Sequence, residues 1–387
     1  MDETEYDVIV IGLGAMGSAS LYQLSKRNIK VLGIDRFNPP HDRGSSHGDT
    51  RITRLAVGEG AAYVPLVLRS HQIWDELEEA SGKKILHKIG HARFSNADGD
   101  KPDSKNVIAR SANLAKEYGI KHELLTNEQI KTRFPMFDFT KNETGYFEPE
   151  SGYVLPELAI STQLQLAKEN GANILINSEV TSVKADGDTV VVSVGEVDYR
   201  AKKVITSAGS WVNDFVPKSH QVFKVERQVL YWFDIKSGYE KFRELPTFFW
   251  SYDNGDIDEI YGFPALDGER GGLKVAMEQH SEFTTPDEFS PQVSKEEEHN
   301  MFITHVKEQI PALSNKAIKS VACKYTVTPD YGFVIDYHPI NKNIIIASPC
   351  SGHGFKHSAA IGEVLSQLAI DGQSEIDIEP FSFDRFK

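Results

Sequence analysis

The chain has 387 residues, with 42 Lys and Arg against 56 Asp and Glu, so its formal net charge is −14. This length predicts two or three domains with a large core. The negative charge repels nucleic acids and anionic lipids, which argues against a function in binding either of them. Hydrophobic residues make up 40% and charged residues 25% of the chain, and these values exclude a disordered or fibrous protein.

Two further features bear on where the protein acts. No apolar run approaches the roughly 20 residues of a membrane span, and the segment Met1–Glu5 is acidic where a secretory signal is basic. The two cysteines, Cys323 and Cys350, are too few for a disulfide framework or a structural zinc site. The sequence therefore predicts a soluble, cytoplasmic protein with no metal centre and no membrane or nucleic-acid partner.

The first predicted elements form a βαβ unit. A β-branched strand at 7–11 is followed by a glycine-rich turn at 12–17 and a helix at 18–26. A second strand at 30–34 ends in Asp35. The turn has the spacing GxGxxG, and it lies between a strand and a helix with an acid 23 positions after its first glycine. This context makes the motif specific for a dinucleotide-binding unit.

Each glycine of the turn has a physical role in that unit. Gly12 allows the tight turn, Gly14 lets the backbone approach a pyrophosphate, and Gly17 lets the helix pack on the strand. The helix N-terminus supplies backbone amides and a positive dipole to the phosphates. Asp35 is predicted to accept a hydrogen bond from a ribose hydroxyl.

The chain then departs from the regular alternation of a nicotinamide-binding domain. Residues 38–51 form a long, polar segment rich in turn formers, and loops of this length usually carry function. Helices are predicted at 63–80 and 107–118, the second of them within a mixed segment at 85–147. We interpret the mixed segment as part of a second domain inserted into the first.

The pattern of the nucleotide-binding fold returns at Pro156. A helix is predicted at 156–169, because Pro followed by Glu suits a helix start and Gly171 closes the helix. Short strands are predicted at 173–176, 180–183, 189–194 and 203–206. The last strand leads to Gly209 and Trp211, and its small residues suit packing against a bound dinucleotide.

The rest of the chain adds a second sheet and a second glycine turn. Residues 216–318 carry alternating aromatic runs, which predict a largely antiparallel sheet. A buried strand at 343–347 is followed by a turn with Gly352 and Gly354 and by a helix at 358–368. That turn offers further backbone amides to an anion or a polar ring edge. The sequence has no repeats or linkers, so we expect interleaved domains.

Several segments stand out together. They are the N-terminal glycine turn and residues 44–54, 58–60, 63–66, 323–326 and 351–356. Together they resemble the family of monomeric sarcosine oxidase and N-methyl-tryptophan oxidase, and the resemblance covers essentially the whole chain. It implies an α/β fold with α+β elements, in which a Rossmann-like FAD-binding βαβ domain is interleaved with a substrate domain on a mixed, largely antiparallel sheet.

The expected FAD-binding domain comprises residues 1–84, 145–215 and 319–387, and the expected substrate domain comprises residues 85–144 and 216–318. The resemblance implies an FAD-dependent oxidase of secondary amines such as N-methyl amino acids. Such an enzyme uses O2 and releases hydrogen peroxide. We therefore expect a monomer whose partners are FAD, a small amino acid or amine, and O2.

The family holds FAD covalently through a cysteine thioether, and the matching residue is Cys323. On the sequence alone, a lone cysteine is more typical of a small buried apolar side chain, which is the interpretation kept for Cys350. The residues that the resemblance and the motifs place on the cofactor are Gly12, Gly14, Ala15, Met16, Gly17, Asp35, Arg36, Ser45, Arg51, Val180, Gly209, Trp211, Cys323, Gly352, Gly354 and Lys356.

The resemblance also implies catalytic residues. Reduction places negative charge on a flavin, so the chemistry needs cations near the ring. His47 and Arg51 are expected beside the flavin, and Tyr261 is expected in the pocket wall. Lys274 matches a lysine that activates oxygen, although on the sequence alone it is typical of a surface strand.

The substrate carboxylate needs a cation in a partly dry pocket. The resemblance assigns this role to Arg54 and Lys356, and it places Glu59 and Phe249 in the pocket lining. Glu278 stands where the family has a pocket histidine. Phe249 and Trp250 likewise stand where sarcosine oxidase has a methionine and its neighbour. These three departures leave the natural substrate open and favour an N-alkyl amino acid larger than sarcosine. No general base is evident in the sequence.

Other functions remain open at the level of sequence. One is an FAD-dependent amine dehydrogenase that passes electrons to an acceptor other than oxygen, and Lys274 argues against it. Another is a non-catalytic or tRNA-modifying FAD-binding relative, although the absence of a basic stripe argues against an RNA substrate. A nicotinamide-dependent dehydrogenase is the last, and a yellow protein would exclude it.

Overall fold

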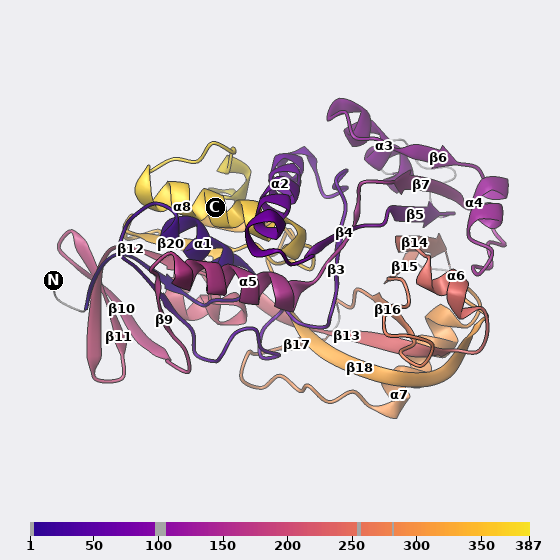
Figure 1. Cartoon of the computed structure of the whole chain (residues 1–387). Coiled ribbons are helices and arrows are strands. Elements are labelled where there is room, and N and C mark those ends of the chain that lie inside the picture. Colours follow the sequence, from indigo (N-terminus) through magenta and orange to yellow (C-terminus); the bar gives the residue numbers. More distant parts are fainter. Residues whose placement is uncertain (1–3, 97–105, 254–256, 281) are drawn as a thin grey trace.

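The computed structural model of the chain describes residues 4–96, 106–253, 257–280 and 282–387; residues 1–3 of the acidic N-terminal segment lie outside the described residues. Two large sheets lie at opposite ends of the molecule (Figure 1), and a small third sheet lies between them in sequence and space. Among the described residues, no helix combines the length and the apolar character needed to cross a bilayer.

The first sheet has a parallel centre. Its parallel strands follow the order β9 (Asn173–Leu175), β2 (Val31–Ile34), β1 (Glu5–Ile11), β12 (Val197–Thr206) and β20 (Ile344–Ser348). Three antiparallel strands extend it, namely β10 (Val180–Asp186), β11 (Thr189–Val194) and β19 (Val334–Tyr337). The central strands are buried on both faces, which explains their continuous β-branched runs.

Four helices pack around the first sheet and its edge. They are α1 (Ala15–Ser25), α2 (Val64–Ser81), α5 (Pro156–Glu169) and α8 (Ser358–Ile370). Helix α1 packs closely on α8, because a Cβ on Gly362 would lie 2.5 Å from the Cβ of Ala19. The large apolar cluster between these helices and β1 makes this part of the molecule a rigid support.

The register of the parallel strands brings three predicted features to one edge. Ile11 pairs with Ile34 on one side and with Thr206 on the other. The carboxyl ends of β1, β2 and β12 therefore coincide, and the next residues along each strand are Gly12, Asp35 and Ser207. Ligands of open α/β sheets bind at this edge.

The second sheet is mixed and largely antiparallel, as expected. Its strands follow the order β17 (Phe283–Thr284), β13 (Lys224–Ile235), β16 (Leu273–Met277), β15 (Ile257–Gly262), β14 (Thr247–Asp253), β5 (His91–Ser95), β7 (Thr144–Glu148) and β6 (Glu123–Leu125), with β18 (Leu313–Val327) also on β13. Only the pair β14 and β5 is parallel among the described pairs. The predicted domain boundary between residues 318 and 319 falls inside β18.

The remaining elements connect the two sheets or cover the second one. A small antiparallel sheet joins β3 (Arg51–Thr53), β8 (Gly152–Val154) and β4 (Leu86–Lys88). The remaining α-helices are α3 (Val107–Glu117), α4 (Asn127–Arg133), α6 (Tyr239–Arg243) and α7 (Lys295–Met301), and Figure 1 shows all four around the second sheet. The predicted helices at 63–80, 107–118, 156–169 and 358–368 are confirmed to within two residues at each end.

Candidate active site

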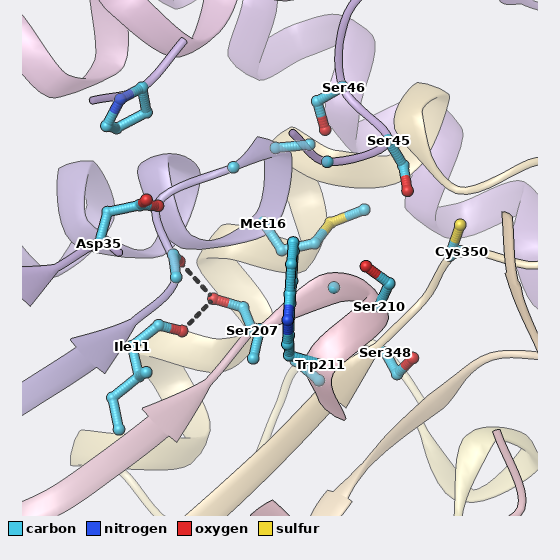
Figure 2. Close-up of a pocket in the computed structure, with 18 of the residues that line it drawn as sticks. Ile11, Met16, Asp35, Ser45, Ser46, Ser207, Ser210, Trp211, Ser348 and Cys350 are labelled. Atoms are coloured by element: carbon cyan, nitrogen blue, oxygen red, sulfur yellow. Dashed lines mark hydrogen bonds between the residues drawn. The ribbon is translucent and has the colours of Figure 1, made fainter. Parts of the chain in front are cut away.

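The glycine turn after β1 forms a tight cradle at the edge of the first sheet. Gly12 has a φ of +83°, a backbone conformation that favours glycine. A Cβ on Gly17 would lie 1.7 Å from the carbonyl oxygen of Gly12, so helix α1 can approach the turn only with glycine at this position. Ser207 closes the cradle, because its hydroxyl donates to the carbonyls of Ile11 and Gly12 (Figure 2).

Gly14 differs from these two glycines. Its missing Cβ would contact only Ser46 Oγ, at 3.8 Å, so the space beside it belongs to a cavity and not to the protein core. Helix α1 begins at Ala15, directly after this open position. Its first backbone amides therefore lie where a phosphate group can approach them.

Asp35 lies at one end of this first cavity. Its Oδ2 accepts a hydrogen bond from the amide of Leu13 at 2.7 Å, and its Oδ1 accepts one from the amide of Phe37 at 2.8 Å. Each carboxylate oxygen has a further lone pair, so the group can still accept from a hydroxyl. In the view of Figure 2, Asp35 is on the left and Cys350 on the right, with Met16 and Trp211 between them.

The walls of the first cavity contain most of the residues predicted to contact the cofactor. They are Gly12, Gly14, Ala15, Met16, Asp35, Arg36, Ser45, Arg51, Val180, Gly209, Trp211, Gly352 and Gly354. The cradle, the helix start that lines the cavity and the acid after β2 fit an adenine dinucleotide. Gly17 does not line the cavity but allows helix α1 to pack against the glycine turn behind this wall. Ser207, Ser348 and Asp214 also line the cavity, and the sequence analysis did not assign them a role.

A second cavity lies against one face of the second sheet. Side chains in adjacent strands share a face when their residues pair, and side chains alternate along each strand. Cys323 pairs with Gln228 and Lys274 with Trp232, so both share a face of β13. Tyr261 pairs with Phe249, and Phe249 with Arg93, on that same face. The second cavity is lined by Cys323, Lys274, Tyr261, Phe249 and Arg93.

The two cavities are continuous. Arg51, Tyr325, Gly352 and Phe355 line both of them. Gly352 has a φ of +83°, and a Cβ there would lie 2.8 Å from the ring of Tyr325. A long ligand in the first cavity can therefore extend past these residues into the second cavity.

The polar segment at 44–51 holds the cations at this junction. Arg51 donates from Nη1 to the carbonyl of Thr50 at 2.9 Å and from Nη2 to the carbonyl of Ser45 at 2.8 Å. Lys274 Nζ donates to the carbonyls of Gly48 and Thr50 and to the hydroxyl of Thr50, at 2.6, 3.0 and 3.0 Å. Backbone carbonyls of this segment therefore order two cations at the junction.

Burial and these cations act in opposite directions on the nearby titratable groups. Burial raises the pKa of the Cys323 thiol, and the charges of Arg51 and Lys274 oppose this rise. Burial and Arg51 lower the pKa of Lys274 well below its ordinary value. Burial and Arg51 also lower the pKa of His47 to about 4. His47 is buried near Arg51 and does not lie in the described lining of either cavity.

Arg54, Glu59 and Lys356 form a buried charge cluster in the second cavity. Arg54 Nη2 donates to both carboxylate oxygens of Glu59, at 2.7 and 2.8 Å. Lys356 Nζ lies 3.4 Å from Glu59 and donates to the carbonyl of His353 at 2.8 Å. Arg54 and Lys356 lower the pKa of Glu59 well below its ordinary value despite its burial. Two cations therefore face one carboxylate, which leaves a net positive charge.

One donor of this cluster has no partner. Arg54 Nη1 is buried without a hydrogen-bond partner among the described residues. A buried unpaired donor of a charged group is costly, so this atom favours an anionic ligand. Glu148 orders the adjacent backbone, because its carboxylate accepts from the amides of Leu55 and Ala56 at 2.8 and 2.9 Å.

The sequence analysis missed a second ion pair in this cavity. Arg93 Nη2 donates to Glu259 at 2.5 Å, and both residues line the cavity. The guanidinium carbons of Arg54 and Arg93 each lie 5.3 Å from the centre of the Phe249 ring. The local signal for Arg93 is weak, because the short strand β5 also contains His91 and Ser95 and shows no apolar run in which a charge would stand out. The sequence analysis also assigned no role to Tyr325, which lines both cavities and lies in the segment 323–326 that resembles the family.

The predicted site residues thus gather in two places. Arg54, Glu59, Phe249, Tyr261, Lys274, Glu278, Cys323 and Lys356 line the second cavity, and Arg51 and Gly352 line both cavities. Gly17 and His47 are buried outside the described linings. The geometry alone therefore indicates a dinucleotide site that opens into a pocket with cations and a buried thiol.

Comparisons with known proteins agree with this geometry. Monomeric sarcosine oxidase from Bacillus sp. (strain B-0618) is 38% identical over 387 residues, which cover 99% of this chain and 96% of that protein. N-methyl-L-tryptophan oxidase from Escherichia coli O17:K52:H18 (strain UMN026 / ExPEC) is 34% identical, covering 99% of this chain and all of that protein.

Solved structures show the same fold. NikD, an unusual amino acid oxidase essential for nikkomycin biosynthesis, superposes with a TM-score of 0.82 at 19% identity and covers 98% of this chain and 97% of its own. L-Proline dehydrogenase from P. horikoshii superposes with a TM-score of 0.80 at 20% identity, covering 99% and 98%. The family model described as FAD dependent oxidoreductase matches residues 7–368. The chain, with its dinucleotide cradle and adjoining cation-lined pocket, therefore belongs to the family of FAD-dependent oxidoreductases.

Proposed function

We propose that this protein is an oxidase of secondary amines that binds an N-alkyl amino acid in the second cavity. The observation that carries the proposal is the charge cluster of Arg54, Lys356 and Glu59 in a cavity that continues into the dinucleotide site. The relatives at 34 to 38% identity are named for N-methyl amino acids, which supports the same substrate class.

Substrate binding begins at the carboxylate. Arg54 Nη1 supplies an unpaired donor, and Lys356 supplies a second cation beside it. Burial lowers the pKa of Lys356 to about 8, partly offset by Glu59. The ammonium form binds an anion and the neutral amine does not. Affinity for a carboxylate should therefore be highest below pH 8 and fall as the pH rises through that value.

Bound FAD supplies the oxidation, because its ring accepts the two electrons taken from the carbon next to nitrogen and passes them to O2. The substrate is left as an imine, which water hydrolyses to an amine and an aldehyde or keto product. Arg51 and Lys274 place positive charge at the junction of the cavities, and Tyr261 lines the pocket beside Cys323. We propose that Cys323 holds the cofactor covalently and that Lys274 serves the reaction with oxygen.

The proposed function is tested by screening the purified yellow protein for peroxide with sarcosine, N-methyl-L-tryptophan, L-proline, pipecolate and glycated amines. We expect peroxide with at least one N-alkyl amino acid. We also expect a higher kcat/KM for one larger than sarcosine, because Phe249 and Glu278 replace other residues of the sarcosine oxidase pocket. The same compounds with an artificial electron acceptor and no oxygen identify a dehydrogenase. Reduction of the acceptor without peroxide in air would contradict the assignment as an oxidase.

The carboxylate site is tested separately. Arg54→Ala should weaken substrate binding by about 2 to 5 kcal/mol, because it removes one of two cations from a desolvated site. Arg54→Lys should not restore binding fully, since an ammonium lacks the planar pair of donors. Arg243→Ala, at an exposed arginine in helix α6, serves as the control. Equal activity on amines that lack a carboxylate would contradict this binding mode.

We also propose a monomer that acts in the cytoplasm. Cys323 and Cys350 form no disulfide in the structure, which supports a reducing compartment. Light scattering on the purified protein should give a mass near 43.3 kDa. A mass of twice that value, independent of concentration, would contradict the monomer.

A further inference from the structure

The pocket contains one carboxyl group that differs from the others. The acidic residues in the described lining are Glu59, Glu259, Glu278 and Asp330. Three of them are paired with arginines, namely Glu59 with Arg54, Glu259 with Arg93 and Asp330 with Arg385. Glu278 accepts no hydrogen bond from the described residues, and one of its oxygens lies 3.9 Å from Nε2 of His280. Its lone pairs are therefore available to a ligand.

Glu278 lies at the junction of the two cavities. Glu278 directly follows β16. Side chains alternate between the two faces of a strand, so Glu278 lies on the same face as Lys274 and Ala276, which is the cavity face. One of its oxygens is 3.1 Å from the position that a Cβ on Gly352 would occupy. Gly352 lines both cavities. The carboxyl group is thus placed where the ends of a cofactor and a substrate meet.

The substrate must present its amine to this region. An α-amino acid carries its amine on the carbon next to its carboxylate. A substrate bound through Arg54 and Lys356 therefore holds the amine one carbon away from those cations, in the same cavity as Glu278. The amine of a free N-alkyl amino acid is protonated at neutral pH, and a protonated amine has no lone pair to stabilise an imine.

We propose that Glu278 is the catalytic base that deprotonates the substrate amine; this assignment rests on the proposed function. The N–H bond of the secondary ammonium breaks, an O–H bond forms on the Glu278 carboxyl, and the electron pair stays on nitrogen. The step involves no oxidation. The neutral amine then carries the lone pair that the loss of hydride from the adjacent carbon requires.

The electrostatic surroundings suit this role. Partial desolvation in the cavity and the carboxylates of Glu259 and Glu59 raise the pKa of Glu278 to about 7, while His280 and Lys356 oppose the rise; 42% of the side chain remains exposed. Glu259 belongs to β15, Glu59 to the loop after β3 and Lys356 to the turn before α8. His280 follows Glu278 by two residues, and Tyr325 of β18 lies beside these groups. A base with this pKa is about half ionised at neutral pH and accepts a proton more readily than an ordinary carboxylate.

The test measures flavin reduction without oxygen, by stopped flow, from pH 5.5 to 10, with sarcosine and N-methyl-L-tryptophan as probes. In the wild type the rate should rise with an inflection near pH 7. Glu278→Gln should lower the rate at pH 7 by about 10² to 10⁴. It should also remove the inflection, so that the rate rises up to the pKa of the free amine.

Three controls separate a base from a structural residue. Methoxyacetate has a carboxylate and no amine, so its Kd, read from the flavin spectrum, should be no weaker in Glu278→Gln than in the wild type. Glu278→His restores a group that titrates near neutral pH and should recover part of the rate. Glu296→Gln, at an exposed glutamate of α7, should behave as the wild type.

The outcomes are distinguishable. A Glu278→Gln variant that keeps the wild-type rate and the inflection near pH 7 would overturn the role of Glu278 while leaving the proposed function intact. So would a weaker Kd for methoxyacetate with an unchanged pH profile, because that result assigns Glu278 to the binding of the carboxylate. Failure of every compound of the substrate screen to reduce the wild-type flavin at any pH would overturn the proposed function together with this assignment.

Discussion

Cys323 and Lys274 share one face of the second sheet, yet their surroundings favour different charge states. Lys274 Nζ has three oxygen acceptors within 3.0 Å, and an ammonium has three N–H donors. This match favours the charged lysine, whereas burial and Arg51 lower its pKa. Cys323 is buried, which raises the pKa of its thiol, and the charges of Arg51, Lys274 and Arg227 oppose this rise only in part.

The first prediction concerns the attachment of FAD. Acid-precipitated wild-type protein should retain its flavin, and Cys323→Ser should release it, because serine provides no thioether. The raised pKa of Cys323 keeps the thiol protonated at neutral pH, so apoprotein should attach added FAD faster at pH 9 than at pH 7. Cys350→Ser should keep the attachment. All of the yellow colour in the supernatant of denatured wild type would contradict the link.

The second prediction concerns oxygen. Lys274→Met should leave flavin reduction by substrate largely unchanged and slow reoxidation by O2 by about 10² to 10³, the effect of losing one fixed charge in a buried site. Stopped-flow mixing of reduced enzyme with O2 measures this rate. Because the active form is the ammonium and its pKa is lowered, wild-type reoxidation should slow as the pH rises, at a lower pH than for an ordinary lysine. Unchanged reoxidation in Lys274→Met would refute the role.

At the scale of elements, the glycine turn combines two separate requirements. Gly17 serves the packing of helix α1 on the turn, whereas Gly14 leaves room in the cavity. The second sheet shows a comparable division. Residues at alternate positions of its strands form the pocket wall, and the remaining positions pack in an apolar core that includes Phe94, Trp250 and Val275. The sheet therefore carries the pocket residues on a rigid backbone.

The third prediction separates the packing role of Gly17 from the cavity role of Gly14. Both variants are made in Cys323→Ser protein from which the flavin has been removed. Gly17→Ala should lower the urea midpoint of the apoprotein, because its Cβ would lie 1.7 Å from the Gly12 carbonyl. Gly14→Ala should leave that midpoint nearly unchanged and weaken FAD binding, since its Cβ meets only open space near Ser46. Equal midpoints for the two variants would show that the close packing at Gly17 contributes nothing to stability.

At the scale of the whole molecule, the dinucleotide cavity lies at the first sheet and the substrate cavity at the second. The two cavities share four lining residues, Arg51, Tyr325, Gly352 and Phe355. The walls of the first cavity come mainly from the edge of the first sheet and those of the second from one face of the second sheet. A dinucleotide that extends through both contacts each half of the molecule. Its binding should therefore stabilise the protein as a unit, since a ligand that binds only the folded state adds its binding free energy to the stability.

The fourth prediction follows for Cys323→Ser, which should bind FAD reversibly. Adding free FAD at 100 times its Kd should stabilise the protein by about 2.7 kcal/mol, with one cooperative thermal transition at a higher Tm. Differential scanning calorimetry measures both. AMP, which fills only the adenosine end of the first cavity, should raise the Tm less. Two separate transitions, of which FAD shifts only one, would contradict a ligand that links the two sheets.

The local features of the fold could be predicted from the sequence because they depend on residues close in the chain. The strand, glycine turn, helix and Asp35 of the βαβ unit follow one another within 35 residues, and the spacing itself specifies which atoms meet. The helices at 63–80 and 156–169 follow in the same way from apolar periodicity and from their end residues. The resemblance to a family extended these predictions to the pocket residues.

The composition of the pocket was decided by the tertiary structure. Arg93, Phe249, Tyr261, Lys274 and Cys323 are spread over more than half of the chain, and only the pairing of β5, β14, β15, β16, β13 and β18 places them on one face. Strand order and register are set by packing of the whole sheet and not by local spacing. For the same reason, the sequence by itself could specify the dinucleotide cradle but not that the carboxyl of Glu278 has no arginine partner among the described residues, which depends on which arginines its neighbours contact.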